Sequence, residues 1–162
     1  MQTSEEISDT DISGRGITAP EVRSQNWTEA FASKSADAFG AAFADDVVLE
    51  GTTLSRPIEG RARVMRVMET ASTAYESLVF THEASNGLRS YLEWEATAFG
   101  GVVLTGVTVL TRNASGEIVH AAIHHRPLGA VLRFSAELRE RLTGVVDPGH
   151  FYDSDADASE RG

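Results

Sequence analysis

The sequence contains no cysteine. Disulfide bonds, a thiol nucleophile and a thiolate zinc site are therefore excluded. No apolar run approaches the roughly 20 residues that a membrane-spanning helix needs. The first 19 residues also lack the basic start and the apolar centre of a signal peptide. We therefore expect a cytoplasmic protein that does not bind a membrane.

Several well-known catalytic motifs are missing as well. The sequence holds no Gly-rich phosphate loop, no Gly-x-Ser-x-Gly elbow and no His-Glu-x-x-His pattern, so we expect no nucleotide or other cofactor. Basic residues are scarce, because 14 Lys and Arg stand against 24 Asp and Glu and give a net charge of −10. A nucleic-acid partner requires a basic face, and none is expected here.

Much of the acidity lies at the two ends of the chain. Residues 1–19 hold four acidic residues and one arginine, and residues 147–162 hold five acidic residues and one arginine. Both ends are poor in apolar residues, which predicts disordered, solvating tails. The remaining residues, 20–146, have the length of one domain with its own core.

Residues 76–127 read as four antiparallel strands joined by tight turns. Asn86-Gly87 and Gly100-Gly101 are turn dipeptides that accept positive φ angles. Pro127 cannot donate to a strand ladder and ends the stretch. The predicted strands are 77–85, 88–98, 102–112 and 117–126.

Apolar spacing predicts helices before and after this meander. A first helix begins at a capping box formed by Thr18 and Glu21 and runs to about Ser33. Ser35 can cap a second helix, and Ser135 can cap a short final one. The second helix is predicted over 36–44, a short strand over 47–50, a third helix over 61–72, and the final helix from 135 to about 142.

Two parts of the sequence resemble the nuclear transport factor 2-like superfamily. Residues 43–50 (FADDVVLE), followed by 57–61 (PIEGR), look like its opening, and residues 106–110 and 116–119 look like its closing strands. That superfamily includes ketosteroid isomerases, limonene epoxide hydrolases and SnoaL-like polyketide cyclases. The resemblance implies a cone-shaped α+β roll, in which N-terminal helices pack on a strongly curved antiparallel sheet that a short C-terminal helix follows.

The resemblance transfers few catalytic residues. The proton-shuttling carboxylate of ketosteroid isomerases falls on Gly51, and their phenol falls near Trp27, whose indole cannot replace it. The Arg-x-Asp pair of the epoxide hydrolases falls on Glu93 and Glu95, and their later Asp falls near Ile123. Both sets are incomplete, so a cyclase-like acid/base site is the nearest type to what remains.

Glu93 and Glu95 share one face of a strand with Tyr91. The resemblance implies that this face lines the cone. Two carboxylates about 6.6 Å apart along a strand would raise one another's pKa if desolvated, and a carboxylate tuned in this way can act as a general acid or base. In the alternative interpretation both glutamates lie on a solvated face and Trp94 anchors the core.

The histidines allow two interpretations. The resemblance places His125 on the cone side of the last strand together with Ile123, and His82 could face the cone near its mouth. Either histidine could equally be a structural group. His120 and His124 would lie about 13 Å apart on a strand, so we expect no metal site.

Two hypotheses about function follow. In the first, the protein is a cofactor-independent cyclase, isomerase or hydrolase that acts on a small apolar substrate, with Glu95 as general base and Glu93 or His125 as its partner. The residues expected to bind the substrate are Trp27, Phe31, Tyr91, His82 and Ile123.

In the second hypothesis the protein is not a catalyst. It binds a small ligand, or it forms a homodimer through the outer face of the sheet, as the resemblance implies. Leu92, Trp94 and Ala96 would then form an interface patch. A cone filled by large side chains, with no pocket at all, is a third possibility.

Overall fold

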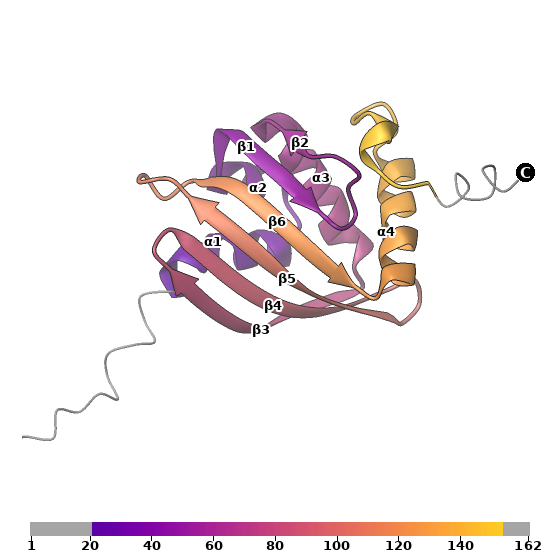
Figure 1. Cartoon of the computed structure of the whole chain (residues 1–162), viewed down its shortest axis with the longest axis horizontal. Helices are drawn as coiled ribbons and strands as arrows, with labels where there is room; N and C mark the ends of the chain where they lie inside the picture. Colours follow the sequence, from indigo (N-terminus) through magenta and orange to yellow (C-terminus); the bar gives the residue numbers. More distant parts are fainter. Residues whose placement is uncertain (1–20, 154–162) are drawn as a thin grey trace, which may run out of the picture.

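The structure, a computed structural model, describes residues 21–153, with side chains described from Gln25 onward. The two acidic stretches 1–19 and 154–162, and Thr18 of the predicted capping box, lie outside the described residues. The elements in chain order (Figure 1) are α1 (Glu21–Ser33), α2 (Ala36–Ala42), β1 (Phe43–Gly51), β2 (Ile58–Glu59), α3 (Arg61–Ala74), β3 (Ser77–Asn86), β4 (Arg89–Ala98), β5 (Val102–Arg112), β6 (Ile118–Arg126), α4 (Leu128–Arg141) and η2 (Pro148–His150).

One six-stranded sheet forms the body of the protein, with the order β2-β1-β6-β5-β4-β3. Strands β3 to β6 form the predicted antiparallel meander. Strand β1 pairs in parallel with β6, so the sheet is mixed. Helices α1 to α3 lie on one side of the sheet and α4 stands along one end (Figure 1). The predicted α+β cone fold is confirmed, and its core lies between the helices and the inner face of the sheet.

Three helix boundaries differ from the prediction, of which one is the end of α3, at Ala74 and not at residue 72. Helix α2 ends at Ala42, and the chain enters β1 at Phe43, where a register shift separates Phe43 from Val48. Helix α4 begins directly after Pro127 and is 14 residues long. Ser135 therefore lies inside α4, where its buried hydroxyl donates to the Thr53 carbonyl at 2.6 Å instead of capping a helix.

The face of strand β4 that packs against the core is not the one that the resemblance implied. It is the opposite face. Leu92, Trp94 and Ala96 are buried, whereas Glu93 and Glu95 are exposed. Burial of an indole stabilises the fold, whereas two carboxylates in the core would each need a partner charge. The inward placement of the two glutamates is therefore wrong, and so is an outer interface patch made of Leu92, Trp94 and Ala96.

Tyr91 and His82 also lie on the outer face. Tyr91 is 36% exposed, on the same side of β4 as the glutamates. His82 lies beyond a register shift between Phe80 and His82, which leaves Thr81 unpaired against β4. A bulge of this kind reverses the alternation of faces along a strand. The His82 ring consequently lies 3.2 Å from the exposed Glu93 carboxylate, not in the cone.

The outer face of the sheet is of mixed character. The charged side chains on the outer face of β4 lie between exposed apolar side chains of the two neighbouring strands. The most exposed of these are Val79 on β3 (61% exposed) and Val103 on β5 (59% exposed). A homodimer formed through this face stays a prediction. Among the described residues, no helix has the length and apolar character needed to cross a membrane.

The first residues of the predicted C-terminal tail are part of the fold. Asp147 caps the short helix η2, and the Phe151 side chain after it is buried. Phe151 forms an isolated bridge with Leu54, and the Ser55 N–H donates to the His150 carbonyl at 2.8 Å. The predicted domain boundary at residue 146 therefore falls too early, because residues 147–151 pack on the domain.

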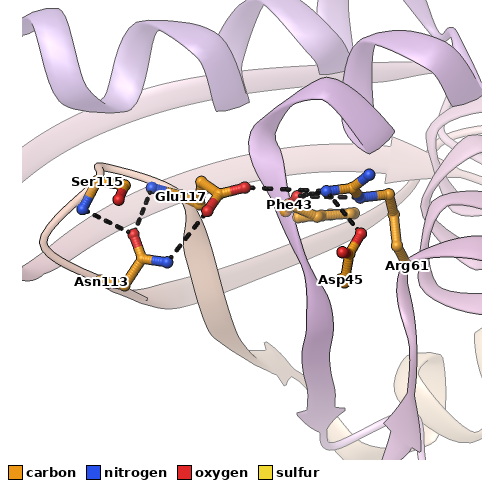
Figure 2. A network of polar contacts seen from close by, with 6 residues as sticks. All are labelled: Phe43, Asp45, Arg61, Asn113, Ser115 and Glu117. Atoms are coloured by element: carbon orange, nitrogen blue, oxygen red, sulfur yellow. Dashed lines mark hydrogen bonds and ion pairs between the residues drawn. The ribbon is translucent and has the colours of Figure 1, made fainter.

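Arg61 joins the start of α3 to the start of β1. Its guanidinium donates from Nε and Nη2 to the Phe43 carbonyl at 3.1 and 2.9 Å. The same Nη2 lies 3.0 Å from the Asp45 carboxylate and 3.8 Å from that of Glu117 (Figure 2). The guanidinium therefore ties together three segments that are distant in sequence.

The turn between β5 and β6 is organised by one asparagine. The side-chain carbonyl of Asn113 accepts from the backbone N–H groups of Ser115 and Glu117, and its amide donates to the Glu117 carboxylate at 3.2 Å (Figure 2). Glu117 thus faces Arg61 from a fixed turn, beside the parallel pairing of Phe43 with Ile118.

Replacing Arg61 by methionine tests this junction. Because R61M removes a charge-assisted contact with a carbonyl and a carboxylate, it should lower the free energy of unfolding by about 1.5–3 kcal/mol in a urea titration. R63M is the matched control, since Arg63 is exposed on the same helix and should change stability little. Equal effects of the two substitutions would contradict the role given to Arg61.

Candidate functional site

A small internal cavity lies inside the cone. Its volume is about 20 Å³, which is room for about one water molecule. Helix α3, the loop after β1, strand β6 and helix α4 supply most of its walls, and Phe31 reaches it from α1. The lining is mainly apolar, with Leu49, Leu54, Val67, Met68, Ala71, Ile123, Phe134 and Leu138 among its members.

Tyr75 and His125 form the polar part of this wall. The Tyr75 hydroxyl lies 2.6 Å from His125 Nε2, and both residues are buried. Tyr75 follows the last turn of α3, and His125 is near the end of β6. The hydrogen bond therefore joins two elements that are 50 residues apart in the chain.

Thr52 contacts His125 from the loop after β1. Its hydroxyl oxygen accepts from the His125 backbone N–H at 2.8 Å and lies 3.4 Å from Nδ1. The Thr52 backbone N–H donates to the Ile123 carbonyl at 3.0 Å. These contacts fix the end of β6, and with it the position of the imidazole.

Aromatic rings surround the pair and keep water away from it. Trp94 meets the His125 ring edge to face with a centroid separation of 4.9 Å, and Phe134 stacks on Tyr75 at 4.7 Å. The Trp94 indole N–H donates to the Thr108 hydroxyl at 3.0 Å, so the tryptophan is itself held in place.

Burial favours the uncharged form of both titratable groups. The pKa of His125 is lowered from 6.5 to about 4, chiefly by desolvation and to a smaller extent by the neighbouring His124, against an opposing hydrogen bond with the Ile123 backbone. Desolvation also raises the pKa of Tyr75 above its ordinary value of 10. At neutral pH the site therefore holds a phenol and a neutral imidazole.

The hydrogen bonds indicate which imidazole nitrogen carries the proton. The Ile123 backbone group that raises the pKa of His125 is its carbonyl, because only an acceptor stabilises the protonated ring. Tyr75 occupies Nε2, so a ring proton on Nδ1 is consistent with both contacts. Nε2 then accepts from the Tyr75 hydroxyl. A ligand that displaces Tyr75 would meet an acceptor on His125 and a donor on Tyr75.

The structure brings some of the predicted site residues together and separates others. His125, Ile123 and Phe31 all line the cavity. Trp27 is fully buried among Phe31, Phe39 and Phe43, and its indole N–H has no partner among the described residues. The other predicted site residues, which lie on the outer face, are Glu93, Glu95, Tyr91 and His82.

Sequence reasoning missed Tyr75. Val64, Met68 and Ala71 recur at helical spacing on the third helix, and one further turn of the same stripe arrives at Tyr75. That extension was the available signal. No sequence pattern predicts the hydrogen bond between Tyr75 and His125, because the bond depends on how two separate elements pack together. The described residues contain no group of three or more His, Cys, Asp or Glu that could hold a metal ion.

Comparison with known proteins now identifies the family. The sequence profile of the SnoaL-like domain matches residues 24–121. The chain belongs to the SnoaL-like family. This confirms the resemblance to the nuclear transport factor 2-like superfamily. No curated protein matches the sequence.

Several solved structures are similar in fold. A protein from Silicibacter pomeroyi with a cystatin-like fold superposes with a TM-score of 0.71 at 20% identity, over 90% of this chain and 94% of that one. A steroid delta-isomerase from Pseudomonas aeruginosa superposes with a TM-score of 0.70 at 20% sequence identity, over 77% of this chain and 92% of that one. A de novo designed protein with a curved β-sheet superposes with a TM-score of 0.60 at 16% sequence identity, over 70% of this chain and 94% of that one. At these identities the likeness concerns the fold alone.

The buried histidine predicts how the stability of this SnoaL-like domain depends on pH. The unfolded chain binds a proton on this histidine below about 6.5, whereas the folded chain resists protonation until about 4. The free energy of unfolding should therefore fall as pH decreases through this window, by roughly 3 kcal/mol from this one group. Urea titrations at several pH values measure the decline.

The H125Q variant isolates this contribution from that of the carboxylates. The difference in the free energy of unfolding between the wild type and H125Q should shrink as the pH falls from 6.5 to 4. H124Q is the matched control, because His124 is the exposed neighbour of His125. A difference that stays constant across the window would contradict a neutral, buried His125.

Proposed function

We propose that this SnoaL-like protein binds a small, uncharged and mainly apolar molecule that carries one carbonyl or hydroxyl oxygen, with Tyr75 and His125 as its polar contacts. The observation that carries the proposal is the buried 2.6 Å hydrogen bond between them at the wall of the internal cavity. Ligand sites typically combine an apolar lining with a few fixed polar groups in this way.

The charge of the site supports an uncharged ligand. Glu50 is the one charged side chain among the residues that line the cavity, and it is exposed and lies 3.4 Å from His120. Burying an ionic ligand without a partner charge is costly. The Tyr75 donor, by contrast, matches a carbonyl oxygen, and the donor and the His125 acceptor together match a hydroxyl group.

Proton transfer on the bound molecule is a second candidate function. It is favoured by the direct contact of two titratable groups, of which the neutral imidazole can accept a proton and the phenol can donate one. Among proteins of similar fold, one is a steroid delta-isomerase. In this version His125, and not Glu95, is the base that removes a proton next to the substrate carbonyl.

Binding is tested with cyclohexanone, a neutral apolar ketone, followed by NMR titration of the labelled protein. Wild-type protein should bind cyclohexanone and should not bind cyclohexylammonium, a cation of similar size. Because Y75F removes one hydrogen-bond donor, it should weaken cyclohexanone binding by roughly threefold to tenfold.

Y91F is the matched control, since Tyr91 lies on the outer face of β4. It should bind as the wild type does. Equal binding by wild type and by a folded Y75F variant would overturn the proposed site, and tight binding of the cation would overturn the predicted ligand class.

Proton transfer is tested by hydrogen exchange in deuterium oxide. If His125 is a base, the protein should accelerate exchange of the protons beside the cyclohexanone carbonyl above the buffer rate, and H125Q should abolish the acceleration. H124Q should retain it. A ketone that binds without accelerated exchange would leave ligand binding as the function and reject catalysis of this kind.

A further inference from the structure

A second hollow lies next to the internal cavity, on the surface between α1, the end of α3 and β3. Its volume is about 330 Å³, which is within the range typical of small-molecule sites. Its walls include Thr28 and Phe31 of α1, Tyr75, and Ser77, Leu78 and Phe80 of β3. We refer to this hollow as the α1–β3 groove.

The groove and the internal cavity share two walls. Phe31 and Tyr75 line both spaces. The Phe31 ring lies 6.5 Å from the Tyr75 ring and 5.8 Å from the Phe80 ring, measured between centroids, and it is partly exposed. These two side chains therefore separate a groove of ligand size from a cavity that holds about one water molecule.

We infer that the α1–β3 groove binds the apolar part of the ligand and that Phe31 is the gate through which its oxygen-bearing end reaches Tyr75 and His125. This rests on the proposed function and deepens it. The internal cavity alone is too small for a molecule of several carbon atoms. Displacement of one partly exposed ring would join the two spaces, whereas Tyr75 is held by its hydrogen bond to His125.

The groove itself favours an apolar ligand segment. The three serine and threonine hydroxyl groups along it already have partners within the protein: Thr28 with the Gln25 carbonyl, Ser72 with the Glu69 carbonyl, and Ser77 with the Thr97 hydroxyl. The apolar side chains of Phe31, Leu78 and Phe80 line the groove beside these hydroxyl groups.

The charges at the rim of the groove balance. Lys34 and Glu76 both border the groove, and the Glu76 carboxylate already accepts from the Gly100 backbone N–H. The rim therefore gives no net attraction for an anion or a cation. An elongated, uncharged molecule with its single oxygen at one end fits both the groove and the polar pair.

The methyl groups of two residues, Leu78 and Met68, report separately on the two spaces. Leu78 lines the groove and not the cavity, and Met68 lines the cavity and not the groove. Cyclohexanone added to methyl-labelled wild-type protein should shift the Leu78 signals first. In F31A both Leu78 and Met68 should shift, with exchange at Met68 roughly tenfold faster than in the wild type.

F31L is included because removing a whole ring can destabilise the fold, and it should show the same change to a smaller extent. The matched control is F99L. Phe99 is also partly buried and contacts Phe134 at a centroid separation of 6.3 Å, but it lines neither space. F99L should leave the rate at Met68 unchanged.

The outcomes distinguish this inference from the proposed function. The role of Phe31 as a gate is overturned if the Met68 methyl signal shifts while the Leu78 signals do not. It is also overturned if F31A and F31L leave the exchange rate at Met68 unchanged. In both cases the proposed site stands. If Y75F binds as tightly as the wild type, the proposed function fails even when Leu78 reports binding in the groove.

Discussion

The indole of Trp94 lies against Gly106, its partner residue on β5, and donates a hydrogen bond to Thr108. A Cβ atom at position 106 would overlap both the Trp94 ring and the His124 carbonyl, so the close approach requires glycine. Because side chains alternate along a strand, an inward Trp94 places Glu93 and Glu95 in solvent. The same indole forms a wall of the His125 site. One packing contact therefore decides both the inner face of the sheet and the chemistry of the interior.

That chemistry is defined by neutral groups. The interior beside Trp94 holds no acid pair of the kind that two inward glutamates would have formed, but a phenol and an imidazole that burial keeps uncharged. Such a pair can satisfy a ligand oxygen without compensating a charge. The site thus follows from exclusion of water by aromatic rings, with Thr52 and the Ile123 backbone holding the histidine in place.

Local signals in the sequence were sufficient for the fold and insufficient for the site. The turns at Asn86-Gly87 and Gly100-Gly101 determine the meander, and the apolar stripes determine the helices. The face of β4 was ambiguous because Tyr91, Glu93 and Glu95 alternate with Leu92, Trp94 and Ala96, and the resemblance favoured the wrong set. The bulge at Thr81 has no local signature. The hydrogen bond between His125 and Tyr75 spans 50 residues and depends on tertiary packing, so no local pattern predicts it.

The segment after η2 reaches back to the loop that carries Thr52. The Ser135 hydroxyl accepts from the Tyr152 backbone N–H at 2.8 Å and donates to the Thr53 carbonyl, one residue from the threonine that positions His125. Phe151 and His150 hold Leu54 and Ser55 on the other side of the same loop. Residues 150–152 thus support the loop that positions the imidazole, so that a cut or a fusion near residue 150 would disturb the interior of the cone.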